Sequence, residues 1–427
     1  MVHHWTRLTR ILALLVALAG PGLALAQGQK VIKIGAVYPL TGNIASTGID
    51  CRRGVELAVD IINGKYDMDL PLARTEGLPN LGGAKLEVVF GDTKGEPKNG
   101  IAEVERLVTQ EKVVAIVGAY QSAVTKTASQ ATERLKIPYV CSDSSSPTLT
   151  QSGYKYFFRA SPHDALFARD QFNFLKDMEK KKGQKVRTIA VLYENTEFGA
   201  NVGKEVVKLA QEYGYKLVEN ISYTANATDV SSEVGRLIQA NPDVLMHASY
   251  ITDAILFTKT FKEMKFQPKA LMTFAGYIEP AYLPAVKADG NGIIVRSTFA
   301  LDLAKNKPLV AKVNELFKKK YGIDMSENAA RSFTAPFILA DAINRAKTTE
   351  AEAVVKAIQE TNFGPNQVLY PWEGVKFDPQ SHQNVYARGI LVQIQKQSYV
   401  TVWPFDSAAA EVIWPLAPWG SKVAQAK

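Results

Sequence analysis

The feature that most constrains this chain is a regular alternation of short apolar runs with amphipathic helical patterns, which begins at Val31. Runs rich in β-branched residues predict strands, and apolar residues that recur every three or four positions predict helices. In the first part of the chain we expect strands at 31–38, 85–90, 113–117 and 138–141, and helices at 54–62, 99–110 and 124–135. Strands that alternate with helices in this way form a parallel sheet, so the pattern predicts an α/β fold.

The alternation begins again after residue 159, which indicates a second unit of the same kind. The expected helices here are 166–178, 199–213, 230–240 and 254–264, and the expected strands are 186–193, 216–223, 243–247, 270–273 and 292–299. A chain of 427 residues is also too long for one ordinary core. We therefore predict two doubly wound, Rossmann-like lobes.

The last predicted helices, at 309–321, 330–346 and 350–361, have too few strands of their own for a third domain. We expect the chain to return to the first lobe near Ser297 and to cross again near Tyr370, which gives a three-segment hinge that permits closure. The predicted division is lobe 1 at 31–158 and 297–368, lobe 2 at 159–296 and 369–404, and a C-terminal tail at 405–427. Residues 64–84, punctuated by prolines and glycines, predict a long surface loop.

The first 26 residues have the pattern of a cleavable secretory signal. Arg7 and Arg10 precede an apolar stretch at 11–19, a Gly-Pro-Gly break follows, and Ala24-Leu25-Ala26 offers a cleavage site after Ala26. The apolar stretch is shorter than the roughly 20 residues that span a bilayer. No cysteine directly follows the cleavage site, which argues against a lipid anchor. We therefore expect a soluble protein of the periplasm.

Charge and cysteine content exclude several classes of protein. The net charge of +8 falls to about +6 when the signal leaves, and it is spread along the chain rather than gathered in a block. The run at 180–182 is interpreted as the solvated end of a helix, so we expect no nucleic-acid partner. Cys51 and Cys141 could form one bridge, but two separate buried thiols are the favoured interpretation.

Motifs of catalysis are missing. The sequence contains no Gly-x-Ser-x-Gly elbow, no phosphate-binding Gly-x-x-x-x-Gly-Lys-Ser/Thr loop and no dinucleotide Gly-x-Gly-x-x-Gly after its first strand. The histidines at 163, 247 and 382 lie far apart and lack metal-ligand spacing. We expect a protein that is not an enzyme and that needs neither a cofactor nor a metal.

Loops that follow strands are the predicted binding segments, because ligands of open parallel sheets lie at the carboxyl ends of the strands. The segment 142–148, called here the serine-rich loop, holds five hydroxyls and one carboxylate in seven residues. The small-residue loop 39–48, the loop 118–122 and the segment 193–199 also follow predicted strands. The residues predicted to contact a small solute are Tyr120, Gln121, Ser122, Asp143, Ser144, Ser145, Glu197, Phe198, Tyr250 and Tyr277.

An ordered set of segments resembles the periplasmic leucine/isoleucine/valine-binding proteins of ABC transporters. The set comprises 32–37 with Pro39-Leu40-Thr41-Gly42, the 118–122 loop, 147–150 with Phe157-Phe158-Arg159, and Tyr193 with Phe198-Gly199. The similarity extends over almost all of the chain after the signal, excluding 64–84 and the tail. It implies a type I periplasmic binding fold, a solute bound by lobe closure, and the permease subunits of an inner-membrane ABC importer as partners. We expect a monomer.

The resemblance also assigns roles to single residues. Ser122 matches a serine that donates to the ligand carboxylate, and Asp143 and Ser145 match positions that hold the α-carboxylate and α-amino groups. Tyr250 matches a tyrosine, and Phe198 stands where the family often has one. The family's disulfide is missing, because neither cysteine matches its positions.

The family's glutamate for the ammonium group is not found where the resemblance expects it. The corresponding segment reads Phe274-Ala275-Gly276-Tyr277, and Ala275 cannot pair with a cation. Because a buried, unpaired ammonium is costly, either Asp143 or Glu197 replaces the glutamate or the ligand has no α-amino group. The specificity stays open between a branched or aromatic amino acid and an amine-free carboxylate or amide.

A second class of function is a soluble periplasmic sensor of the same fold that presents its ligand to a membrane receptor. A receptor would normally keep a membrane span or a partner domain. A signal with no later apolar span favours a freely diffusing carrier.

Overall fold

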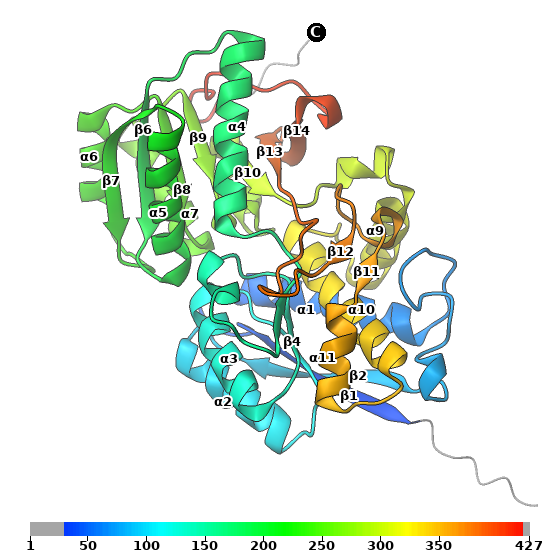
Figure 1. The fold of residues 1–427 in the computed structure, drawn as a ribbon. Helices are drawn as coiled ribbons and strands as arrows, with labels where there is room; N and C mark the ends of the chain where they lie inside the picture. The colour runs from blue at the N-terminus through cyan, green and yellow to red at the C-terminus, as the bar shows by residue number, and fades with distance from the viewer. Residues whose placement is uncertain (1–29, 422–427) are drawn as a thin grey trace, which may run out of the picture.

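The computed structural model describes residues 30–421 and contains two large sheets, one in each half of the molecule (Figure 1). The first sheet has five parallel strands in the order β2-β1-β3-β4-β5. Its strands are β1 (Val31–Tyr38), β2 (Lys85–Asp92), β3 (Ile116–Gly118), β4 (Tyr139–Cys141) and β5 (Phe157–Arg159). This arrangement confirms the α/β class, and the strand order 2-1-3-4-5 is typical of a doubly wound sheet.

The second sheet has seven strands in the order β14-β13-β10-β9-β8-β6-β7. The strands β6 to β10 pair in parallel with one another, whereas β13 pairs antiparallel with both β10 and β14. The bounds are β6 (Thr188–Glu194), β7 (Lys216–Tyr223), β8 (Val244–Ala248), β9 (Ala270–Thr273), β10 (Ile294–Ser297), β13 (Ile390–Gln395) and β14 (Ser398–Trp403). A small pair, β11 (Asn362–Phe363) and β12 (Val375–Lys376), stands apart from both sheets.

Helices cover both faces of the sheets. Successive side chains of a strand point to opposite faces, and apolar side chains on each face need a helix to bury them. On β1, Ile34 and Ala36 join a core that includes α1 and α10, whereas Val37 joins a separate cluster with α2 and α3. The helices are α1 (Ala45–Asn63), α2 (Pro97–Thr109), α3 (Ser122–Leu135), α4 (Asp164–Lys182), α5 (Glu197–Glu212), α6 (Ser231–Ala240), α7 (Ile251–Glu263), α8 (Tyr282–Val286), α9 (Pro308–Tyr321), α10 (Glu327–Ala346) and α11 (Ala351–Gln359).

The chain passes between the two sheets three times. It leaves the first sheet after β5, builds β6 to β10, and returns so that α10 packs against α1, β3 and β4 (Figure 1). Residues 362–384 still run beside the first sheet, where Arg159 N donates to His382 O over 3.0 Å. The chain joins the second sheet again only at Ile390. The exact lobe boundaries given above stay a prediction.

Two segments outside the alternation, the insertion and the tail, are packed against the rest of the molecule. The insertion 64–84 buries Leu70 and Leu78, and its Asn80 N donates to Asn344 Oδ1 over 2.9 Å. The tail is fastened to the second sheet's half, because Trp419 Nε1 donates to Phe266 O and Leu416 N donates to Lys269 O, each over 2.7 Å.

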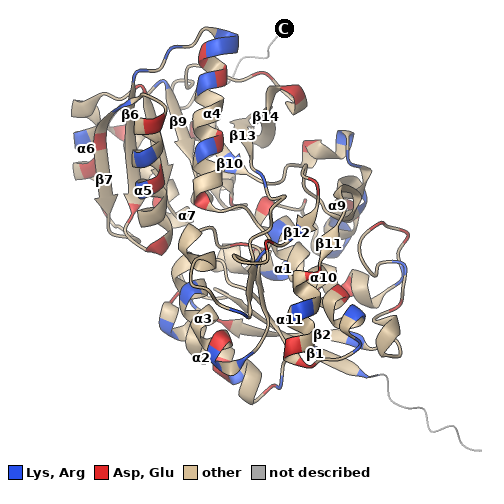
Figure 2. Cartoon of the chain, in the orientation of Figure 1, with Lys and Arg blue, Asp and Glu red and all other residues tan. Residues whose placement is uncertain are grey.

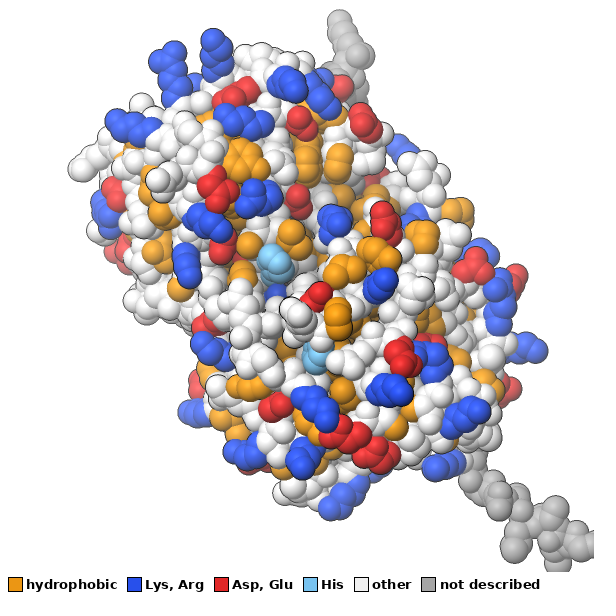
Figure 3. Space-filling model, viewed as in Figure 1, with side chains coloured by type: hydrophobic (Ala, Val, Ile, Leu, Met, Phe, Trp, Pro, Cys, Tyr) orange, Lys and Arg blue, Asp and Glu red, His pale blue; other side chains and the backbone are white. Residues whose placement is uncertain are grey.

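The expectation of two separate buried thiols is confirmed: Cys51 in α1 and Cys141 in β4 are both buried and unbridged. The run at 180–182 is exposed at the end of α4, and charged residues of both signs alternate along the helices (Figure 2). The face seen in Figure 3 likewise mixes basic and acidic side chains without a large area of one sign. Across residues 30–421, no helix combines the length and apolar character of a membrane span. The predicted signal lies outside the described residues.

Candidate functional site

The loops at the carboxyl ends of the two sheets face each other and are in contact. Near the rim of this contact, Lys126 of α3 pairs with Glu197 of α5 over 2.9 Å, and Asn43 Nδ2 donates to Asn226 Oδ1 over 3.4 Å. These residues come from loops or helices that follow β1, β3, β6 and β7. The interface between the sheets is therefore built from the segments in which the sequence predicts the site.

Three predicted site residues form one aromatic cluster that crosses this interface. The Tyr120 ring of the first sheet's loop lies 5.7 Å from the Tyr250 ring, and the Phe198 ring lies 5.3 Å from the Tyr250 ring on the other side. All three side chains are buried, and each lies in the loop or the helix start that comes after a strand. Tilted rings at this spacing are a favourable aromatic arrangement and give the interface an apolar wall.

Glu279 is a charged residue of the interface that the sequence analysis missed. Its Oε1 accepts from the Tyr120 hydroxyl over 2.7 Å, and its Oε2 accepts from the Thr47 hydroxyl, so two first-sheet residues hold a second-sheet carboxylate. Glu279 has no exposed surface, and burial raises its pKa to about 8 although the Tyr120 hydrogen bond acts in the opposite direction. It comes two residues after Tyr277, just beyond the segment 274–277 where a glutamate was sought.

Ser122 begins α3 and faces the serine-rich loop. Its Oγ accepts from Ser146 N over 3.2 Å, and no residue in 30–421 is found to accept from its hydroxyl. Ser144 Oγ bonds Ala119 O at 2.8 Å and Tyr120 O at 3.0 Å. The two hydroxyl-bearing loops of the first sheet are therefore linked to each other, and the free backbone N–H groups of a helix start lie beside them.

The phenol of Tyr250 reaches the same helix start. Burial raises the pKa of Tyr250, and hydrogen bonds from the Thr196 side chain and the backbone N–H of Ser122 act in the opposite direction. A phenol from the second sheet's half thus lies beside the start of α3. The position suits any oxygen acceptor, including a carboxylate.

The structure places two predicted acids away from the aromatic cluster. The Asp143 carboxylate accepts from Tyr38 OH and from Ser332 Oγ, each over 3.0 Å, so it points into the layer between β1 and α10. Burial raises its pKa to about 6. Glu197 is bound by Lys126 and also accepts from Thr148 Oγ1 over 2.5 Å, so it bridges the two halves at their rim.

The remaining predicted residues divide between the interface and the core. Gln121 and Tyr250 help to line a cleft of ≈ 210 Å³ between the two halves, together with Asn43, Thr196 and Asn226. Ser145 is buried beside this region, where its carbonyl accepts from Asp164 N over 2.7 Å. Tyr277 does not line the cleft. Its hydroxyl bonds His247 Nδ1 over 2.6 Å inside the second half.

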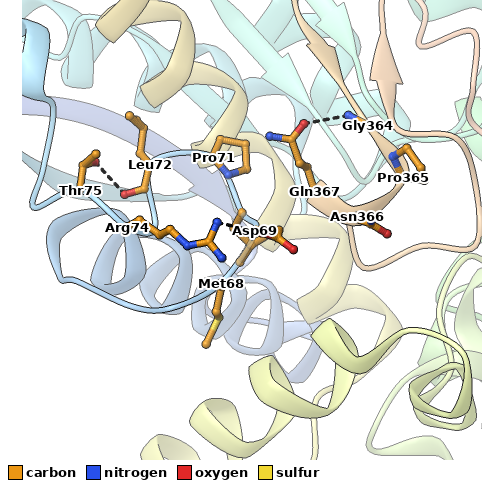
Figure 4. Close-up of a pocket in the computed structure, with 11 residues that line it drawn as sticks. Met68, Asp69, Pro71, Leu72, Arg74, Thr75, Gly364, Pro365, Asn366 and Gln367 are labelled. Carbon is orange, nitrogen blue, oxygen red and sulfur yellow. Dashed lines mark hydrogen bonds and ion pairs between the residues drawn. The ribbon is translucent and has the colours of Figure 1, made fainter.

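A larger open groove of ≈ 610 Å³ lies elsewhere, between the insertion and residues 364–367 (Figure 4). Its side chains include Arg74, which donates to Asp69 Oδ1 over 2.8 Å, and Gln367, which accepts from Gly364 N. None of the predicted site residues lines it. Within the described part of the chain, no group of three or more His, Cys, Asp or Glu side chains is arranged to hold a metal ion.

Comparison with known proteins gives the same picture as the geometry. A family described as periplasmic binding protein matches residues 31–398. The Leu/Ile/Val-binding protein homolog 7 of Brucella melitensis is 30% identical over 421 residues, which cover 95% of this chain and 99% of that protein.

Solved structures share the fold over most of the chain. The leucine-binding protein LivK of Thermotoga maritima has a TM-score of 0.74 at 20% identity and covers 88% of this chain and 99% of its own. A second solved structure is the branched-chain amino acid transporter substrate-binding protein LivJ of Streptococcus pneumoniae in complex with isoleucine. It has a TM-score of 0.73 at 20% identity, and the match covers 90% of this chain and 100% of the LivJ chain. At this level of identity the likeness establishes the fold, which confirms the predicted type I periplasmic binding architecture.

Proposed function

Since this chain belongs to the periplasmic binding protein family, among the substrate-binding proteins of branched-chain amino acid ABC transporters, we propose that it binds a small amino acid between its two sheets and delivers it to an importer in the inner membrane. The observation that carries the proposal is the meeting of Tyr120 and Ser122 with Tyr250 and Glu279 across the interface. The proposal includes lobe closure, a periplasmic location and a role without catalysis.

The α-carboxylate of the solute would be held at the start of α3. Ser122 offers a hydroxyl proton and a backbone N–H, and the helix start adds the positive end of its dipole. The Tyr250 phenol that now meets the Ser122 N–H would give way to the carboxylate. Ser144 and Ser145 would act through the shape of the serine-rich loop, which they fasten to its neighbours.

The α-ammonium group would pair with Glu279. This residue supplies the acid that Ala275 cannot, so it favours an amino acid over an amine-free carboxylate or amide. The carboxylate already faces the other half through Tyr120 and Thr47, and a buried ion pair forms well when hydrogen bonds satisfy the remaining lone pairs. Asp143 is less suited because it points into the layer between β1 and α10, and Glu197 is less suited because it already pairs with the cation of Lys126.

The side chain of the solute would lie against the aromatic cluster of Tyr120, Phe198 and Tyr250. A cluster with rings from both halves becomes complete only when the halves meet, so an apolar side chain between them would favour the closed form. The isoleucine held by the LivJ protein supports a branched apolar side chain as the first candidate.

A thermal-shift screen of the secreted form tests this function. The screen compares branched-chain and aromatic L-amino acids with aliphatic carboxylates, amides and urea, since a ligand that binds only the folded protein raises its melting temperature. We expect L-leucine, L-isoleucine or L-valine to give the largest rise. A rise with amides or amine-free acids alone would contradict the proposal. Capture of permease subunits by the loaded protein, against capture of a membrane receptor, separates a carrier from a sensor.

A further inference from the structure

A buried bridge of three charged residues connects the second sheet to the first sheet's half. Arg296, in β10, has its Nη1 3.1 Å from Oε1 of Glu327, the first residue of α10. The same oxygen accepts from Thr298 Oγ1 over 3.1 Å and lies 3.6 Å from Arg331 Nη1. The charged side chains are only 1–2% exposed, so one carboxylate serves two desolvated guanidinium groups.

Arg331 continues the bridge to the serine-rich loop. Its Nε donates to Ser142 O over 3.0 Å, and its Nη2 donates to Asp143 O. The planar guanidinium fixes both carbonyls at once, because its donors have a rigid geometry. The start of the loop that faces the solute site is therefore held by a side chain of α10.

Arg296 keeps its connection with the second half. Its guanidinium lies 4.5 Å from the ring centroid of Phe167, which is in α4. Separation of the two sheets would draw Arg296 and Phe167 away from Glu327. The remaining charged partner of Glu327 would then be Arg331, whose donors also hold the loop.

Several polar atoms of this bridge have no hydrogen-bond partner among residues 30–421, namely Arg296 Nε, Arg331 Nη1 and Glu327 Oε2. Buried groups of this kind are costly when they lose their remaining charge partners. The three side chains are therefore most stable when they stay together, and moving Arg296 away from Glu327 should disturb Arg331 and the loop that it holds.

We propose that Glu327 and Arg331 are positioning residues that couple the shape of the serine-rich loop to the separation of the two sheets. The coupling goes beyond solute binding itself. The coupling is measured in the solute-free protein, so the result does not depend on whether the proposed function is correct.

The test uses Glu327→Gln and Arg331→Lys in the full secreted chain, with Asp341→Asn as the matched control. Asp341 is also on α10 and pairs with Arg345 over 2.7 Å, but it lies outside the bridge. Fluorophores on Lys98→Cys in α2 and Gln211→Cys in α5 report the distance between the halves. Both positions are exposed, whereas Cys51 and Cys141 are buried and stay unlabelled. Amide hydrogen exchange reports on residues 142–146.

Both bridge variants are expected to speed exchange at 142–146 by at least about ten-fold and to shift the interlobe distances of the solute-free protein, while Asp341→Asn changes neither. Unchanged exchange in a folded variant overturns the proposal. A loosened loop with unchanged interlobe distances overturns it as well, since the loop would be held but not coupled. Arg331→Lys keeps the buried positive charge and decides the question alone if Glu327→Gln does not fold.

Discussion

The hydroxyl of Tyr120 donates to Oε1 of Glu279 over 2.7 Å, although the two residues follow strands of different sheets. The contact places a fully buried acid at the centre of the interface between the halves. It also gives the proposed solute an anionic partner that the segment 274–277 does not contain. Much of what can be tested about binding depends on this one carboxyl group.

Binding of an amino acid should release a proton. Burial raises the pKa of Glu279 to about 8, so the group is largely protonated at pH 7, and pairing with an ammonium requires its carboxylate. The apparent affinity for L-leucine should therefore rise from pH 6 to about pH 8 and then level off. Calorimetric titrations at pH 7 in buffers of different ionisation enthalpy should report release of about one proton per ligand. Binding without proton release would contradict this role for Glu279.

The same group should lower the stability of the solute-free protein as the pH rises. The pKa of Glu279 is higher in the folded chain than in the unfolded chain, so its contribution is fully present below about pH 4.5 and is lost as the pH rises through about 8. Urea unfolding between pH 5 and 9 measures the slope. Glu279→Gln should flatten the slope, and an identical slope in the variant would show that Glu279 does not titrate in this range.

Ser122→Ala should weaken solute binding by about 1–3 kcal/mol, because it removes a donor to a buried carboxylate. It also leaves Ser146 N, which now donates to Ser122 Oγ, without its partner. Ser129→Ala is the matched control, since Ser129 is a buried serine of the same helix whose hydroxyl donates to Lys126 O over 2.9 Å. Equal affinities for the two variants by calorimetry would remove Ser122 from the site.

Glu197→Gln should favour the open form, although we expect the residue 197 side chain to make no direct contact with the solute. Glu197 joins the halves through Lys126 and Thr148, and Lys126 is about half exposed, so solvent screening limits the pair. We expect a loss of less than about 1 kcal/mol in binding, carried by faster dissociation. Stopped-flow rates for Glu197→Gln and for Glu212→Gln on the same helix check this. A slower association with unchanged dissociation would contradict it.

The regular part of the fold could be read from the sequence. Strands β1, β7 and β9 have the predicted bounds, and the turn residues Pro39, Gly214 and Pro268 lie within two residues of their ends. Helix α1 begins at Ala45 rather than at 54, since its first turns carry Thr47 and Asp50, polar residues that are buried and hide the helical period.

Five strands were not predicted, and β5, β13 and β14, which belong to the two large sheets, show why. β5 has only three residues, too few to show a period, and it exists because β4 pairs with it. β13 and β14 form a hairpin through Lys396 and Gln397, which both have positive φ. That turn normally uses Asn-Gly or Asp-Gly, so Lys396-Gln397 does not indicate a hairpin.

The loops of the candidate site could be predicted from the sequence, but not all of its residues. The rule that ligands lie at strand ends identified the loops of Tyr120, Ser122, Phe198 and Tyr250. Glu279 was missed because the chain first makes a turn of 3-10 helix at Ala275–Ile278, which moves the acid beyond the matched segment. The buried arginines could not be foreseen, because only tertiary contacts distinguish them from exposed ones.

The most direct test of the account compares L-leucine with 4-methylpentanoate, which keeps the carboxylate and the side chain and has a hydrogen in place of the ammonium group. Calorimetric titration of both ligands into the parent protein and into Glu279→Gln gives four affinities. The account predicts that the parent prefers L-leucine by at least about ten-fold and that the variant loses most of this preference. Equal binding of the two ligands by the parent, or a preference that survives in Glu279→Gln, would contradict it.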